Sequence, residues 1–271
     1  MKDLTTYQNE IIIFCKSYHN DIERIKILFD SIKKHNKDNI PFYISIPKQD
    51  LELFQSELGT EGWNVIFDED LTTQTDVQSH FTQRLFKMEF YKTKIAQYYL
   101  IIDSDMYFIR DFYKTDFVAA NGIPYFTIHE CKDLMELSWK IKGSGVLLDW
   151  FKAERLPLME IFGRTGKAYD YSGSALLYIS EVFKGLYEEY CVPNNLTFLD
   201  LLNTHGSENT WFGEFVLYSG LTYYPTGPMF KTFHYPEQYA LSKQLGMTEE
   251  MFAANYLGIT MQSNWNSPLK Y

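Results

Sequence analysis

The sequence predicts an α/β fold in which a mostly parallel central sheet is flanked by helices. Three observations predict it. Short apolar runs rich in β-branched residues alternate with segments of helical periodicity over roughly the first hundred residues. One of these runs ends in two closely spaced aspartates, and no internal repeat interrupts the series. Such alternation indicates parallel strands joined by right-handed crossover helices.

The first five elements follow this rhythm closely. Residues 10–15 (EIIIFC) form a short apolar run typical of a buried parallel strand, and Lys16 follows it at the edge of the sheet. Asn20 or Asp21 can cap a helix whose apolar residues lie on one face. We then expect a strand at 42–46, a helix at 51–58 and a strand at 63–67, followed by a polar loop over 68–79.

A long helix is predicted next. Phe81, Leu85, Met88, Ile95 and Tyr99 recur at helical spacing and describe about five turns leading into the next strand. Lys87 lies near the middle of this helix, where it could contact a phosphate or ribose or simply belong to a solvated face.

The second half is predicted to be less regular. We expect strands at 125–129 and 174–179, and two short helices between 145 and 162, separated at Pro157. A polar loop lies between these helices and the second strand. Ser207 can cap a further helix that carries Glu208 and Glu214.

The stretch Tyr98-Tyr99-Leu100-Ile101-Ile102-Asp103-Ser104-Asp105 organises the chain. Residues i and i+2 of an extended strand point to the same side, so Asp103 and Asp105 would converge past the carboxyl end of a buried strand. Ligands bind at that edge of open α/β sheets. Two carboxylates brought together are costly without a cation, and oxygen ligands suit Mg²⁺ or Mn²⁺. The alternative is a solvated acidic turn.

Composition excludes several classes of function. The net charge of −10 argues against a general nucleic-acid-binding face. No apolar run approaches the roughly 18 residues of a membrane-spanning helix, and the N-terminus does not resemble a secretory signal. Three widely separated cysteines (Cys15, Cys131, Cys191) are typical of reduced thiols in a cytoplasmic protein.

With these motifs in order, the chain resembles the GT-A-type glycosyltransferases, which are metal-dependent nucleotide-sugar transferases with one Rossmann-like domain. The resemblance rests on "YYLIIDSDMYF", the loop "DYSGSALLYIS", the helix start "SENTWFGEF" and the late "FKTFHYP". It spans most of the chain and is strongest to small bacterial transferases of surface polysaccharides, such as those of capsule or lipopolysaccharide.

The resemblance implies roles for particular residues. Asp103 resembles the aspartate that contacts ribose or a metal-bound water, Asp105 the direct metal ligand, and His234 the late histidine that completes the metal shell. Ser104, between the aspartates, and Lys16, after the first strand, would lie near the nucleotide. The implied cofactor is Mn²⁺ or Mg²⁺, with a UDP-sugar as the default donor and a saccharide or glycolipid as acceptor.

Glycosyl transfer also requires a base that takes the proton of the acceptor hydroxyl, and a carboxylate serves this purpose. Glu208, Asp170 and Glu214 are the candidates, and the pattern does not choose cleanly between them. Glu208 is the first choice because it starts a helix beside a polar stretch; a capping or dipole role is its alternative. A carboxylate base would accompany direct displacement, with inversion at the anomeric carbon.

Two other interpretations compete with a transferase. A haloacid-dehalogenase-like phosphatase also uses Asp-x-Asp after a strand, but that family has Thr or Val where this chain has Tyr107. A sugar-nucleotide-binding or assembly protein without turnover is the other. We expect one domain over 1–271, with a nucleotide- and metal-binding half to about 112 and an acceptor-binding half from about 113. Its expected location is cytoplasmic, or peripheral at the inner face of the cytoplasmic membrane.

Overall fold

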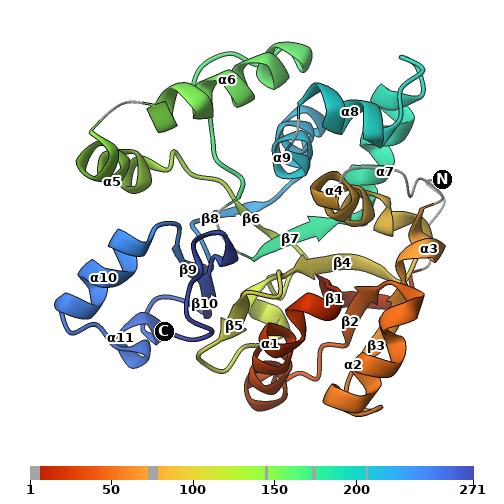
Figure 1. Cartoon of the computed structure of the whole chain (residues 1–271). Coiled ribbons are helices and arrows are strands. Elements are labelled where there is room, and N and C mark those ends of the chain that lie inside the picture. Colours follow the sequence, from red (N-terminus) through yellow and green to blue (C-terminus); the bar gives the residue numbers. More distant parts are fainter. Residues whose placement is uncertain (1–6, 73–78, 144–145, 173–174, 206) are drawn as a thin grey trace.

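A five-stranded sheet runs through the middle of the computed structural model, which describes residues 7–72, 79–143, 146–172, 175–205 and 207–271 (Figure 1). The strand order is β3-β2-β1-β4-β7. The bounds are β1 Asn9–Lys16, β2 Phe42–Ile46, β3 Asn64–Phe67, β4 Ala96–Ile101 and β7 Leu176–Ile179. Strands β1 to β4 pair in parallel, and β7 is antiparallel to β4. The predicted mostly parallel sheet is therefore confirmed.

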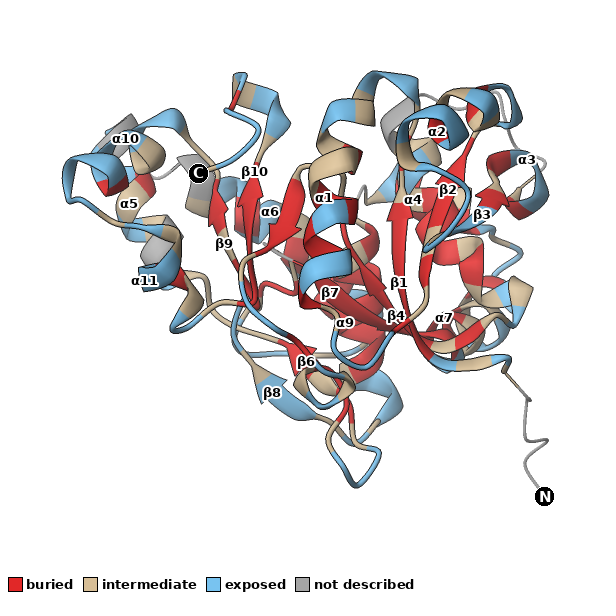
Figure 2. Ribbon diagram, turned by 90° about the horizontal axis from the view of Figure 1, so that it is seen from below, coloured by how far each residue is buried: buried red, intermediate tan, exposed pale blue. Residues whose placement is uncertain are grey.

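Helices cover both faces of this sheet. Helices α1 (Ile22–His35) and α2 (Leu51–Leu58) lie on one side, and α4 (Ser79–Glu89) and α7 (Ser180–Gly185) on the other (Figure 1). Helix α1 buries Ile25, Leu28, Phe29 and Ile32, the stripe that the sequence indicates. Strands β1, β2, β4 and β7 are mostly buried between these layers, whereas the edge strand β3 exposes Asn64 and Val65 (Figure 2). Because these buried strands are covered on both faces, their sequences are nearly continuous apolar runs.

A second sheet joins the C-terminal part of the chain to the first. It has the order β5-β10-β9, with β5 at Met106–Phe108, β9 at Phe230–Phe233 and β10 at Gly258–Met261. Strand β10 is antiparallel to β5 and parallel to β9. Since β5 directly follows the aspartates, this pairing brings the segments after β9 and β10 beside them. A third, two-stranded sheet pairs β6 (Tyr125–Thr127) with β8 (Tyr224–Thr226).

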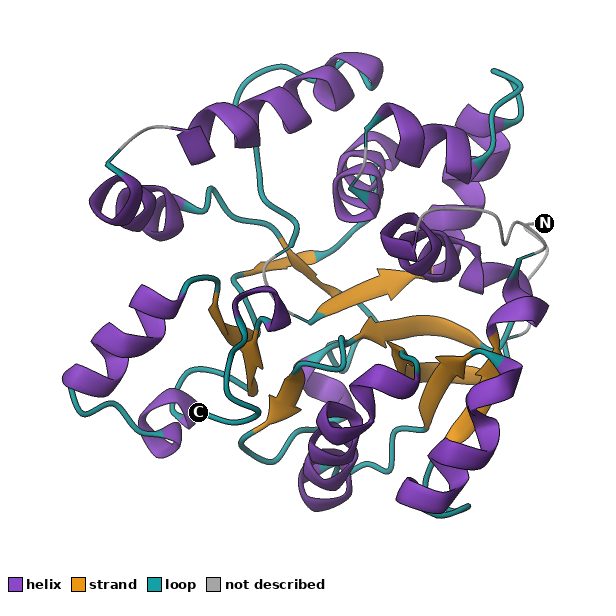
Figure 3. Ribbon diagram, in the orientation of Figure 1, coloured by secondary structure: helices purple, strands orange, loops and turns teal. Residues whose placement is uncertain are grey.

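The second half is mainly helical around these small sheets (Figure 3). Its helices are α5 Lys132–Lys142, α6 Val146–Ile161, α8 Phe198–Thr204, α9 Glu208–Ser219, α10 Pro236–Gln244 and α11 Glu249–Ala253. One hydrophobic cluster contains residues from both halves of the chain, among them Ile12 of β1 and Phe230 of β9.

Three predicted elements differ from the structure. The long helix ends at Glu89 and is followed by a 3₁₀ turn (Phe90–Thr93), and Lys94 is left-handed before β4 begins. Pro157 lies within the single helix α6 rather than between two helices; Leu158 and Met159 beside it are buried, so packing holds the helix through the proline. The predicted loop after β3 begins with a short helix, α3 (Asp68–Leu71). Residues 73–78 of this predicted loop lie outside the described residues, as do positions 145, 173 and 174 of other predicted elements.

Candidate functional site

The two aspartates lie in a turn that joins β4 to β5. The amide of Met106 donates to the carbonyl of Asp103 at 3.1 Å and closes this turn. The sequence pattern predicts that Asp103 and Asp105 lie on one side of an extended strand, but in the structure they lie in a turn. Both still line the same cleft, which has a volume of about 590 Å³. The cleft lies beyond the carboxyl end of β4, where an open α/β sheet binds its ligands.

The cleft collects most of the site residues that the sequence predicts. They come from α4, the β4–β5 turn, the loop before β7, the start of α9 and the segment after β9; they are Lys87, Asp103, Asp105, Asp170, Glu208 and His234. The bounding segments are far apart in the chain and meet here because β5, β9 and β10 share one sheet. Lys16, Ser104 and Glu214 do not line this cleft.

Asp105 has an unusual environment. Burial and, to a smaller extent, the negative charge of Asp103 raise the pKa of its carboxyl group from 3.8 to about 6. A hydrogen bond from the Ser263 amide to Oδ2, at 3.0 Å, opposes this increase. A partly buried carboxylate beside a second one is a site of negative potential that a cation would relieve.

Lys87 connects two carboxylates in the cleft. Its Nζ lies 2.8 Å from Oδ1 of Asp103 and 3.7 Å from Oε1 of Glu208. Burial disfavours the charged form of this lysine, but the two carboxylates outweigh burial and raise its pKa. Arg84, one turn earlier on α4, lies 3.5 Å from the other oxygen of Glu208. Glu208 is itself buried, so it is held between two cations.

His234 enters the cleft directly after β9. Its backbone amide donates to Oε1 of Gln238 at 2.7 Å, which fixes the chain at this point. Burial lowers the pKa of the imidazole, despite the opposing charge of Asp170, so the ring is neutral and able to act as a metal ligand. The ligand atoms of Asp103, Asp105 and His234 do not all come within 4.8 Å of one another. The three residues share the cleft without forming a compact ligand set.

Asp170 is held by a buried ion pair. Nη2 of Arg155, on α6, lies 3.1 Å from its Oδ1. Burial alone would raise the pKa of this carboxyl group, but the charge of Arg155 and the hydrogen bonds from Ser172 outweigh it and lower the pKa. Asp170 also lines a second cavity of about 510 Å³, which shares Cys131, Thr232 and His234 with the cleft.

Glu214 serves as a structural residue rather than lining the cleft, although it was a candidate base. Its side chain is wholly buried and receives two hydrogen bonds of 2.6 Å from Arg164 and one of 2.8 Å from the Tyr171 hydroxyl. The ring of Tyr171 lies against α9 where a Cβ at Gly213 would come within 2.1 Å of it. Only glycine leaves room for this contact.

Lys16 and Ser104, predicted to lie near the nucleotide, do not line the cleft, and their side chains contact other groups. Nζ of Lys16 lies 2.9 Å from Asp68 and 2.6 Å from the carbonyl of Ser17, and its side chain is buried. Parallel pairing places the ends of β1 and β3 at one edge of the sheet, which explains the ion pair. The side chain of Ser104 hydrogen-bonds Asp21.

Several residues of the cleft escaped the sequence analysis. Nothing in the local sequence distinguishes Arg84 from a solvated helix residue, although its spacing of three from Lys87 puts both on one face of α4. Arg155 gives no local signal, because only the fold brings it to Asp170. The backbone of Ser263, which contacts Asp105, belongs to a tail without a regular pattern.

Comparison with solved structures finds the same fold in the apo crystal structure of mouse xyloside xylosyltransferase 1. The match has a TM-score of 0.52 and 7% sequence identity, and covers 96% of this chain and 99% of that one. At this identity the likeness establishes the fold. It confirms the predicted GT-A-like architecture, a mostly parallel sheet flanked by helices.

Three further findings bound the identity of the chain. In the described parts of the structure, every helix is too short or too polar to cross a membrane. No curated protein matches the sequence. The profile of one protein family matches residues 10–156, which is more than half of the chain and includes both aspartates. The chain therefore belongs to DUF6492, a family of unknown function.

Proposed function

We propose that this protein is a glycosyltransferase that moves a sugar from a nucleotide-diphosphate donor, by default a UDP-sugar, to a saccharide or glycolipid acceptor. The observation that carries the proposal is the meeting of Asp103, Asp105 and His234 in one cleft beyond the carboxyl end of β4. The fold shared with a xylosyltransferase supports it. Synthesis of a bacterial capsule, lipopolysaccharide or other surface glycan is the role proposed from the sequence resemblance.

The residues present fit a divalent cation. Two carboxylates and a neutral imidazole are suitable ligands for Mn²⁺ and, through the oxygens, for Mg²⁺. Burial, with the nearby charge of Asp103, raises the pKa of Asp105, and a bound cation would offset both effects. The hydroxyl of Thr260 in the cleft wall is buried and has no hydrogen-bond partner among the described residues. When bound, the cation would neutralise the charge that develops on the leaving diphosphate.

The cations of α4 have a complementary role. Lys87 is buried at the base of the cleft and forms its closest ion pair with Asp103. Arg84 is more exposed and pairs with Glu208. Both are within the cleft that would hold the diphosphate, and a buried lysine held in its charged form can bind phosphate oxygens without a large change of position.

Glu208 is the proposed base. Its carboxylate lines the cleft next to the Lys87–Asp103 pair, whereas Asp170 is held ionised by Arg155 at a lowered pKa and is therefore a weak proton acceptor. Asp170 lies where the cleft meets the second cavity, which is the proposed position of the acceptor. We propose that most donor contacts lie in the half that ends near residue 112 and most acceptor contacts in the half from about 113, within one domain, with His234 of the second half completing the metal site.

A panel of nucleotide sugars tests this function. In calorimetry with Mn²⁺ present, at least one nucleotide sugar or its nucleotide diphosphate should bind, and chelation with EDTA should abolish binding reversibly. Asp105→Asn should lose this binding. Asp111→Asn should keep it, because Asp111 is an exposed carboxylate paired with His35 outside the cleft. Binding that is unaffected by EDTA and by Asp105→Asn would refute the proposed metal site.

Turnover separates a transferase from a binding protein. Donor consumption that increases when saccharide acceptors are added supports transfer. Tight binding without consumption, across donors and acceptors, would instead support a sugar-nucleotide-binding or assembly protein without catalysis. We propose a cytoplasmic location, at most peripheral to the membrane; resistance to extraction by high salt and carbonate would contradict it.

A further inference from the structure

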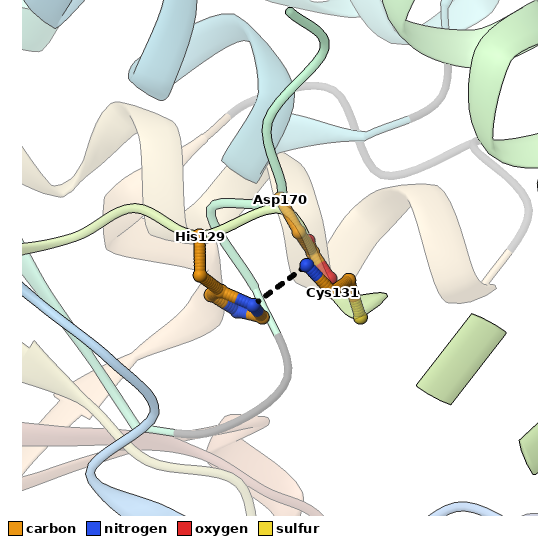
Figure 4. A group of neighbouring side chains, drawn as sticks. All are labelled: His129, Cys131 and Asp170. Atoms are coloured by element: carbon orange, nitrogen blue, oxygen red, sulfur yellow. Dashed lines mark hydrogen bonds between the residues drawn. The ribbon is translucent and has the colours of Figure 1, made fainter. Parts of the chain in front are cut away.

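A second group of possible metal ligands lies in the wall between the cleft and the neighbouring cavity. His129, Cys131 and Asp170 each offer one ligand atom, and these atoms all lie within 4.8 Å of one another (Figure 4). His129 and Asp170 are held side by side because their backbones exchange two hydrogen bonds, of 3.1 and 2.7 Å. Cys131 follows in a left-handed conformation, with φ of 54°, at the start of α5.

The hydrogen bonds of His129 resemble those of a metal-binding histidine. Its Nδ1 accepts a hydrogen bond from the Cys131 amide at 3.2 Å, so this nitrogen carries the lone pair. Nε2 then carries the proton and points to the carbonyl of Ser172 at 3.4 Å. Histidines that bind metals usually donate their other ring N–H to a carbonyl or carboxylate in this way. The lone pair of Nδ1 points to the Cys131 amide, so a metal bound at Nδ1 would take the place of this hydrogen bond.

Asp170 is arranged with one oxygen engaged and one available. Arg155 Nη2, the Ser172 amide and the Ser172 hydroxyl all donate to Oδ1, at 3.1, 3.0 and 2.7 Å. Within the described chain, Oδ2 receives no hydrogen bond. Arg155 thus orients the group through one oxygen while the other can bind a cation.

We propose that His129, Cys131 and Asp170 bind Zn²⁺. Thiolate and imidazole ligands favour zinc over the Mg²⁺ or Mn²⁺ that the aspartates of the β4–β5 turn would select. Ligand atoms on a tetrahedral zinc are about 3.3–3.6 Å apart, so the ligand atoms, which lie within 4.8 Å of one another, need to approach by at most about 1.5 Å. Cys131 and Asp170 line both cavities, so the fourth position is open to small ligands. This site does not depend on the proposed transferase activity.

Cobalt substitution tests the proposal, because Co²⁺ bound to a thiolate gives a near-ultraviolet charge-transfer band and, when tetrahedral, intense visible bands. Metal-free protein titrated with Co²⁺ should develop both with one equivalent, and Zn²⁺ should displace the cobalt. Cys131→Ser should abolish the charge-transfer band. It should also weaken zinc binding by more than the roughly 10- to 100-fold that loss of a hydrogen-bond partner of a ligand costs.

Two controls make the result specific. Cys191→Ser removes a buried thiol elsewhere in the fold and should retain the band, while His129→Gln should lose zinc affinity as Cys131→Ser does. Asp105→Asn should leave the band unchanged, which separates this site from the proposed donor site. Absence of the band in the native protein, or its persistence in Cys131→Ser with an unaltered circular dichroism spectrum, would overturn the proposal.

Discussion

Neutralising Asp105 should stabilise the metal-free protein. Its pKa is about 6 in the fold against an ordinary value of 3.8, a difference of about two pH units. The folded state therefore binds more protons than the unfolded state between these values, and the free energy of unfolding falls as pH rises from about 4 to about 6. At about 1.4 kcal/mol per pH unit, the full loss above pH 6 is about 3 kcal/mol. Asp105→Asn removes this loss while its amide oxygen can still accept from Ser263.

Chemical denaturation in EDTA, at pH 4 and pH 7.5, measures this effect. The variant should be more stable than the native protein at pH 7.5, by as much as about 3 kcal/mol, and nearly equal to it at pH 4. Added Mn²⁺ should stabilise the native protein only, because a ligand that binds the folded state stabilises it. In Asp111→Asn, the carboxylate removed has a pKa that its hydrogen bond with His35 lowers, so no stabilisation is expected. An Asp105→Asn variant that is less stable than the native protein at pH 7.5 would refute the reasoning.

Two further predictions concern the carboxylates of α9. Arg164→Met leaves Glu214 buried and without its cation, and should reduce the free energy of unfolding by about 3–5 kcal/mol in urea; a loss below about 1 kcal/mol would contradict a structural role for the pair. Glu208→Gln should retain donor binding in calorimetry and lower transfer by about two to four orders of magnitude. If instead Asp170→Asn is inactive and Glu208→Gln is not, Asp170 is the base.

The strands of the sheet could be predicted because each one is marked by its own short run of apolar residues. β1 and β2 are buried on both faces, so their apolar runs mark them to within a residue or two. The start of β4 was missed for a definite reason. Ile95 and Tyr99 are four apart, a spacing that places two residues on one face of a helix but equally on one face of a strand. Only pairing of Tyr99 with Ile12 and Tyr178 decides in favour of the strand.

The site could be predicted only as far as strand order determines it. The turn after β4 and the segment after β9 meet because of the sheet, and the motifs mark both. Strand order does not determine whether Glu208 or Glu214 enters the cleft. Six residues apart on one helix, they point in widely separated directions, so they could not both enter the cleft. Which one does is decided by Arg164 and Tyr171, whose approach to α9 no local pattern reveals.

Lys87 compensates part of the negative charge of the acidic turn. Two carboxylates partly removed from water repel each other. Burial and the charge of Asp103 raise the pKa of Asp105, and Lys87 compensates the charge of Asp103 at 2.8 Å. A metal bound at the aspartates would replace Lys87 as the partner of Asp103. The same ammonium group also lies 3.7 Å from Glu208, so its position reflects the charge on both sides of the cleft. Metal binding at the turn and the charge of the proposed base are therefore coupled through one side chain.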